Sequence, residues 1–160
     1  MNNLADKNIL FIAPVFHDYY RQIIQALSSF GATVDFFPER KYNILFKVYN
    51  HLSHTRLLHA YQERHYNQIL QSISATKEYD YLFVIRGYMI TSSFLRNFKS
   101  RFPKAKLIMY QWDSNKTNPF SSVIQYFDKV LSFDYYDCAK LSLNYLQLFY
   151  SDDLVKYKAL

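Results

Sequence analysis

The sequence predicts one α/β domain with a Rossmann-like open sheet that is mainly parallel and has helices on both faces. The main observation is a pair of apolar runs in the middle of the chain, at residues 81–85 and 106–110, in which polar and apolar residues do not alternate. Such strands need cover on both faces, which is typical of parallel sheets. A helical pattern separates the two runs, and the same order of strand, helix and strand occurs at residues 8–37. This repetition favours right-handed crossovers with the first strand inside the sheet.

The first unit is delimited by residues that begin or end regular structure. A strand at residues 8–14 is followed by a turn at 15–20, in which Asp18 can act as the N-cap, and then by a helix that runs through Leu27 to Phe30. Gly31 lies just past this helix, where a left-handed backbone is often needed. The next apolar run, at residues 32–37, predicts the second strand.

Residues 39–78 interrupt this order with a basic segment. Apolar residues recur at helical spacing from 44 to 52 and again from about 55 to 73. The spacing predicts one interrupted helix or two consecutive helices, which either cover the sheet or project from it.

The central helix and the later elements follow from caps and breakers. Thr91 or Ser92 can cap the helix between the two apolar runs, and Pro103 ends it. The later elements are, in order, a loop at 115–119, a short helix from Ser121 or Ser122 to Tyr126, a strand at 129–133, a short helix at 134–141 and a last strand at 146–150. We therefore expect a domain at 1–150 and a tail, or the start of a linker to a second domain, at 151–160.

Composition excludes several classes of site. With two glycines in 160 residues, neither Gly-rich phosphate-binding motif can be present. One cysteine, Cys138, permits no disulfide within the chain and favours a reducing cytoplasm. The N-terminus lacks the pattern of a signal peptide, and no apolar run approaches the roughly 20 residues needed to span a bilayer. The formal net charge of +6 favours anionic partners.

Polar residues follow the predicted strands and should gather at one edge of the sheet, where ligands bind in open α/β folds. Asp113 follows the strand at 106–110 and could act as a general base, or it could serve as an N-cap or an Asx-turn residue. His17, in the first turn after a strand, could be a base or a hydrogen-bonding group, or simply a solvated side chain.

The pair Arg86 and Gly87 follows the other central strand. The arginine could bind a phosphate or carboxylate group, or it could pair with a neighbouring carboxylate of the protein. The glycine permits a positive φ or the close approach of a ligand. Trp112 and Ser114, which flank Asp113, complete the candidate substrate-binding set.

The basic segment could lie on an anionic membrane surface or form an amphipathic cover of the sheet. The residues that would contact such a surface are Arg40, Lys41, Lys47 and Arg56. The histidines between 51 and 65 lack the spacing of a zinc site, so we expect no bound metal. Because the aromatic residues concentrate in core strands, nucleic acid is not expected as a partner. No pair of aspartates follows the first strand, which disfavours a receiver-type signalling domain.

Taken together, the segments at 7–37 and 79–114, followed by FDKVLSFDYYDCAK and LQLFY, resemble the amino-terminal half of bacterial glycosyltransferases of the two-Rossmann (GT-B) type. The resemblance is to CgeB-like enzymes and to transferases of lipopolysaccharide or capsule biosynthesis. It rests on a strand ending in Arg-Gly, a strand ending in Trp-Asp-Ser, and Phe-Asp-Lys-Val before a strand ending in Phe-Asp.

The resemblance implies an acceptor-binding domain that by itself is an incomplete hexosyltransferase. The expected reaction transfers a sugar from a nucleotide-sugar, bound mainly by a second domain, to a glycan or lipid-linked acceptor in surface-polysaccharide biosynthesis. No tightly bound cofactor is implied, and the location would be the cytoplasm, at the inner face of the cell membrane. Asp113 or His17 would be the base, and Arg86 would orient an acidic group. The alternative is a non-catalytic Rossmann-like module that binds a partner protein or a second subunit.

Overall fold

The computed structural model describes residues 4–41, 43, 44, 46, 48, 55–73 and 76–149. The elements are, in chain order, β1 (Asn8–Ala13), α1 (Tyr19–Ser29), β2 (Thr33–Pro38), α3 (Thr55–Ser72), β3 (Tyr81–Ile85), α4 (Ser92–Arg101), β4 (Lys106–Gln111), the 3-10 helix η1 (Ser121–Tyr126), β5 (Lys129–Ser132), α5 (Tyr135–Leu141) and β6 (Asn144–Tyr145). The chain thus alternates strands with helices, as predicted.

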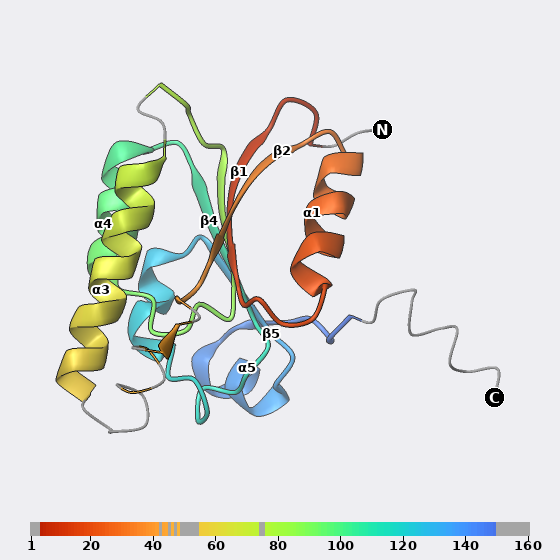
Figure 1. The fold of residues 1–160 in the computed structure, drawn as a ribbon. Coiled ribbons are helices and arrows are strands. Elements are labelled where there is room, and N and C mark those ends of the chain that lie inside the picture. The colour runs from red at the N-terminus through yellow and green to blue at the C-terminus, as the bar shows by residue number, and fades with distance from the viewer. Residues whose placement is uncertain are drawn as a thin grey trace, which may run out of the picture.

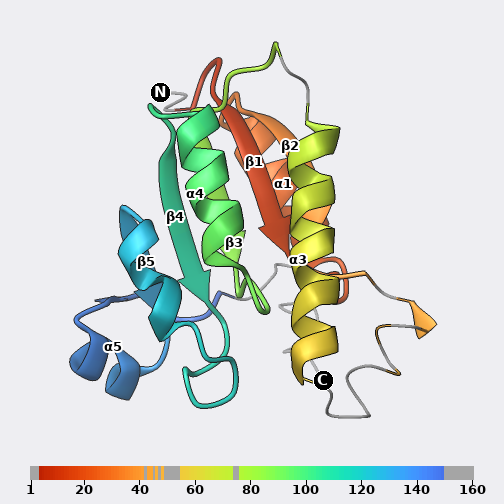
Figure 2. The same cartoon turned by 90° about the vertical axis from the view of Figure 1, so that its left-hand side faces the viewer.

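The strands form a sheet in the order β2-β1-β3-β4-β5-β6, and every neighbouring pair is parallel. Helix α1 packs on one face of the sheet, and α3 and α4 pack side by side on the other (Figures 1 and 2). The predicted fold class, an open parallel α/β sheet with helices on both faces and β1 inside it, is confirmed.

Along each inner strand, successive side chains pack alternately into two separate apolar layers, one on each face of the sheet. Leu10 and Ile12 of β1 face the layer under α3 and α4, whereas Phe11 faces the layer under α1. The first layer is well covered, because aromatic residues of α4 such as Phe94 and Phe98 are fully buried in it. The α1 layer is thinner, because α1 itself has no fully buried residue.

The α1 face of the sheet is incompletely covered beyond β1. Phe83 in β3, Ile108 in β4 and Leu131 in β5 are only half-buried, whereas neighbouring residues that face α3 and α4 are buried. Apolar side chains of central strands normally lose all contact with water.

Several local predictions were wrong. Asp18 occupies the N-cap position of α1, but its side chain makes no capping hydrogen bond. The short helix after the loop is a 3-10 helix whose N-cap is Phe120, rather than a helix capped by Ser121 or Ser122. The side chain of Asn115 takes over the capping role, since its Oδ1 accepts hydrogen bonds from the backbone N–H groups of Phe120 and Ser121.

The last strand is also displaced from its predicted position. Residues 144–145 pair with β5, and the predicted residues 146–149 have left the sheet. The reason is that β5 ends at Ser132, whose carbonyl oxygen accepts the final hydrogen bond from Leu146. Most of the helical prediction for 44–52 lies outside the described residues, whereas the prediction for 55–73 is confirmed by α3.

Candidate binding site at the carboxyl edge of the sheet

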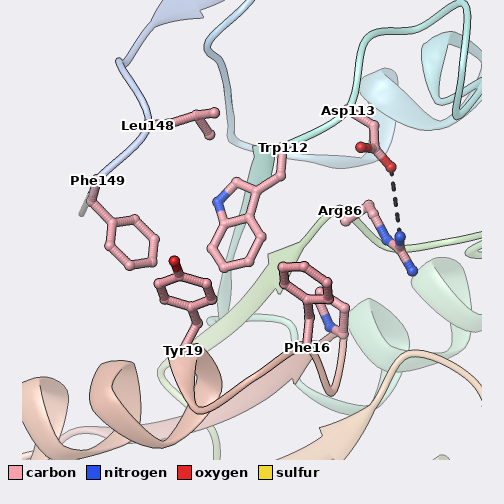
Figure 3. A pocket seen from close by; sticks show the side chains of 8 residues that line it. Phe16, Tyr19, Arg86, Trp112, Asp113, Leu148 and Phe149 are labelled. Carbon is pink, nitrogen blue, oxygen red and sulfur yellow. Dashed lines mark ion pairs between the residues drawn. The ribbon is translucent and has the colours of Figure 1, made fainter. Parts of the chain in front are cut away.

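A cleft of about 350 Å³ lies at the carboxyl edge of the sheet. It lies where the chain turns outwards in opposite directions from β1 and β3, which is the usual place for ligands in open α/β sheets. We call it the aromatic cleft and define it by its lining residues, which are Pro14, Phe16, Tyr19, Arg86, Trp112, Asp113, Leu148 and Phe149 (Figure 3).

Arg86 is held in a left-handed conformation at the end of β3. Its φ is 62°, which is costly for a residue with a side chain. Two buried amides hold its backbone carbonyl oxygen, with Nε2 of Gln111 donating at 2.9 Å and Nδ2 of Asn118 donating at 3.0 Å. These contacts fix the point at which the arginine leaves the sheet.

Gly87 serves the same turn. Its φ is 61°, and a Cβ atom at this position would lie 2.7 Å from Cγ1 of Val84. The glycine is therefore required by the backbone path and by close packing. Gly87 is not among the residues that line the aromatic cleft.

The guanidinium of Arg86 is bound to a buried carboxylate that sequence reasoning did not single out. Glu39 follows β2 and is completely buried. Its carboxylate accepts a bidentate pair of hydrogen bonds from Nε and Nη2 of Arg86, and a third from the backbone N–H of Tyr88 at 2.9 Å. Burial lowers the pKa of Arg86, while the charge of Asp113 acts in the opposite direction. The ion-pair alternative for Arg86 is thus realised, with Glu39 as the partner.

Asp113 is the second carboxylate near Arg86. Its Oδ2 lies 3.6 Å from Nη1 of the arginine, and a third of its side chain is exposed (Figure 3). This separation gives attraction between charges but no hydrogen bond. Within the described residues, the Asp113 carboxylate accepts no hydrogen bond, so it retains free acceptor capacity at the cleft wall.

His17 and Ser114 lie near the cleft but do not line it. His17 is exposed, has a φ of 46° and packs its ring edge-on against Phe16. The backbone carbonyl oxygen of Ser114 accepts hydrogen bonds from the N–H groups of Thr117 and Asn118, so Ser114 shapes the loop after β4. Whether His17 or Asp113 acts as a base stays a prediction.

Aromatic rings form one wall of the cleft. Trp112, Tyr19 and Phe149 pack against one another with ring centroids 5.3–6.1 Å apart. The indole N–H of Trp112 is buried and has no acceptor among the described residues. Sequence reasoning identified Trp112 but missed Phe16, Tyr19, Leu148 and Phe149. Two features of the sequence could have indicated these residues. One is the group of aromatic residues within 16–20, soon after the first predicted strand, and the other is the apolar run at 146–150, which was predicted to be a strand.

The residues predicted to contact a membrane surface are spread over different environments. Arg40 stacks over the rings of Phe46 and Tyr88, at 4.9 and 5.4 Å, and Lys41 is partly exposed. Arg56 is exposed on α3, and Lys47 lies outside the described residues. Membrane contact stays a prediction. In the described part of the chain, no helix combines the length and apolar character needed to cross a bilayer, and no cluster of three or more metal-binding side chains occurs.

No family model and no curated protein matches the chain. A solved structure that does match is that of a response regulator from Burkholderia pseudomallei with a phosphorylated aspartic acid, a calcium ion and citrate. The match has 13% identity and a TM-score of 0.41, and it covers 94% of this chain and 65% of the other. A likeness at this level carries no argument about function.

The predicted glycosyltransferase identity is wrong. The comparisons give it no support, because no family model and no curated protein matches the chain and the solved structure named above is that of a response regulator. The predicted transfer of sugar in lipopolysaccharide, capsule or other polysaccharide biosynthesis is corrected with it. The physical reason is that short polar motifs after buried strands recur in open α/β sheets generally. In this chain Arg86 and Gly87 form a turn, and Arg86 pairs with buried Glu39. Neither role is specific to glycosyltransferases.

Proposed function

We propose that this domain is a non-catalytic binding module that presents the aromatic cleft to a partner protein. The observation that carries the proposal is the chemistry of the cleft. Its walls are mainly aromatic and aliphatic, and its one cation is already bonded to buried Glu39. Mainly apolar clefts with a few fixed polar groups are typical binding sites.

An exposed apolar surface continues from the cleft and supports a protein as the partner. We call it the apolar strip and define it as Tyr135, Tyr136, Tyr145, Leu146, Leu148 and Phe149, all of which are more than 40% exposed. The segment at 144–149 links its two ends, with Tyr135 and Tyr145 stacked at 4.1 Å at one end and Phe149 in the cleft at the other. Contiguous exposed apolar surfaces of this kind mark sites of protein contact.

Two unsatisfied features would be relieved by such a partner. A partner large enough to extend from the cleft over the α1 face would also cover the half-buried side chains of Phe83, Ile108 and Leu131. The indole N–H of Trp112 could donate to a backbone carbonyl oxygen of the partner after a small shift of the surrounding side chains.

The chain provides its own probe for the test, because Trp112 is its one tryptophan and lies in the cleft. Peptides selected from a random library against the purified chain are titrated while Trp112 fluorescence is recorded. We expect selected peptides to change the emission and Phe16→Ala to weaken their binding by about tenfold or more, since a central aromatic anchor typically contributes about 2 kcal/mol or more.

Phe30→Ala is the matched control. Phe30 is an equally exposed phenylalanine, but it follows the other end of α1, at the amino edge of the sheet. Its substitution should leave peptide affinity unchanged. Equal losses in both variants, or binding that leaves Trp112 emission unaltered, would contradict the proposal. A concentration-dependent dimer that Phe16→Ala dissociates would show instead that a second copy of this chain covers the cleft.

A further inference from the structure

We propose that the aromatic cleft receives a cationic side chain of the partner, a lysine-type ammonium, held between aromatic rings and Asp113. This inference rests on the proposed function, because it names the chemistry of the group that enters the cleft. Three features of the described residues carry it: the charge balance at the cleft, the free acceptor capacity of Asp113, and the aromatic walls.

The charge balance at the cleft is negative despite the presence of an arginine. Arg86 brings one positive charge, and Glu39 and Asp113 bring two negative charges. Glu39 is fully buried and uses its carboxylate on Arg86 and the Tyr88 backbone, so the arginine's charge is largely compensated inside the protein. The remaining negative charge belongs to Asp113, which lines the cleft.

Asp113 is also the group with capacity for a new bond. Arg86 is its ion-pair partner at 3.6 Å, beyond hydrogen-bond length, and a third of its side chain reaches solvent. An entering ammonium could approach this carboxylate to hydrogen-bond distance without displacing any hydrogen bond described here. An anionic group would be repelled by the net negative charge, and a purely apolar group would bury the Asp113 carboxylate without giving it a hydrogen-bond donor.

The walls suit the same ligand. Phe16 and Trp112 line the cleft from opposite sides of the sheet's switch point, one after β1 and the other after β4, with Tyr19 beside them (Figure 3). The faces of aromatic rings attract cations, and tryptophan does so most strongly. The four-carbon stem of a lysine is apolar and would pack against Leu148 or Phe149, which also line the cleft.

The other charged groups nearby do not line the cleft: Arg40 lies over the rings of Phe46 and Tyr88, and two more lie near the start of α1. Asp18 and Arg21 form an exposed pair with each other at 3.3 Å. The guanidinium of Arg21 also lies 5.5 Å from the centre of the Tyr20 ring, away from the residues that line the cleft.

The test compares a cation with a neutral group of the same shape. Trp112 fluorescence is titrated with capped lysine, capped trimethyl-lysine and a capped analogue whose side chain ends in an uncharged tert-butyl group. We expect trimethyl-lysine, which carries the charge but no N–H donor, to bind at least about fivefold more tightly than the neutral analogue, because both the aromatic rings and the Asp113 carboxylate attract the charge. Capped lysine, which can also donate a hydrogen bond to Asp113, should likewise bind more tightly than the neutral analogue. Asp113→Asn should reduce this ratio to about one or two, and Asp113→Glu, which keeps the charge, should preserve most of it.

Asp18→Asn is the matched control, because it removes an exposed carboxylate from the same edge without touching the cleft. It should leave the ratio unchanged. Equal binding of the cation and the neutral analogue would overturn the inference while leaving the binding module intact, since the cleft would still be occupied. Selected peptides that bind at Trp112 but lack lysine would overturn it in the same way. Loss of peptide binding at the cleft altogether would instead refute the proposed function.

Discussion

At the residue scale, the polar groups of the carboxyl edge are arranged by burial. Glu39 loses all contact with water and therefore must be paired, and Arg86 supplies two hydrogen bonds to it. Removing one member of a buried pair usually costs more than the pair contributes, because the other charge is left without compensation. The pair thus fixes the geometry of the cleft, and Asp113 is left as the group that can respond to a ligand.

His65 shows the same influence of burial on a titratable group. It lies on α3, is almost fully buried and places Nε2 2.8 Å from the carbonyl oxygen of Pro38. Burial lowers the pKa of His65 below its ordinary value of 6.5, and nearby Lys41 lowers it further, while the hydrogen bond to Pro38 acts in the opposite direction. The unfolded chain therefore takes up this proton at a higher pH than the folded domain does.

We predict that the free energy of unfolding falls as the pH decreases from about 7 through 6.5, and that His65→Gln removes part of this dependence. The glutamine retains an N–H donor for the carbonyl oxygen of Pro38. Urea unfolding followed by circular dichroism at several pH values measures the effect, with His59→Gln as the control because His59 is exposed on the same helix. An unchanged slope in the His65 variant would contradict the assignment.

The sequence allowed some of these roles to be predicted. Arg86 and Asp113 could be placed at one edge of the sheet because each lies just beyond the end of a buried strand, and the structure brings them to within 3.6 Å of each other. The partner of Arg86 could not be identified, because Glu39 lies 47 positions earlier in the chain and reaches it only when β2 and β3 flank β1. Contacts of this kind depend on strand order, which no local pattern records.

At the element scale, capping explains which helix starts could be predicted. Thr91 is an extended residue whose Oγ1 accepts a hydrogen bond from the N–H of Phe94, as predicted for the cap of α4. Asp18 has the residue type of a cap but a backbone with ψ near 11°, outside the extended conformation that most capping residues adopt. Its carboxylate instead pairs with Arg21 on the surface. Residue type is thus a reliable signal only where the backbone before the helix is extended.

We predict that Thr91→Ala destabilises the domain by about 1 kcal/mol, the usual contribution of a capping side chain. Asp18→Ala should cost only a few tenths of a kcal/mol, because an exposed ion pair is screened by water. The midpoints of urea unfolding of the two variants distinguish these outcomes. A loss for Asp18→Ala as large as that for Thr91→Ala would mean that the aspartate stabilises α1 by a route other than its surface ion pair.

At the scale of the whole molecule, the fold could be predicted because continuous apolar runs at regular intervals specify strands that are buried on both faces. Crossover helices between these strands make them parallel, so their carboxyl ends share one edge of the sheet, and that edge could also be located. The walls of the cleft were less predictable. Leu148 and Phe149 reach it because the chain leaves the sheet at the end of short β5, an effect of strand length on the fold as a whole.

The two apolar layers share the same strands, and this coupling has a measurable consequence. Phe98 belongs to α4 and is fully buried against the sheet, on the opposite face from Trp112. We predict that Phe98→Ala lowers the free energy of unfolding by about 3–5 kcal/mol, as expected for the loss of a buried aromatic side chain. Because residues 10 and 11 of β1 pack into opposite layers, neither layer can lose its structure without disrupting the strands that support the other.

The Trp112 fluorescence transition and the circular dichroism transition should therefore move together to lower urea concentration in the Phe98→Ala variant, with equal midpoints. The substituted residue belongs to α4, on one face of the sheet, whereas Trp112 lies in the cleft on the α1 side. The two transitions therefore show whether both faces of the sheet unfold together. A fluorescence midpoint that stays at the value of the unmodified chain while the dichroism midpoint falls would mean that the cleft side unfolds independently. In that case the α1 layer and the Arg86–Glu39 pair would be sufficient to keep the carboxyl edge folded.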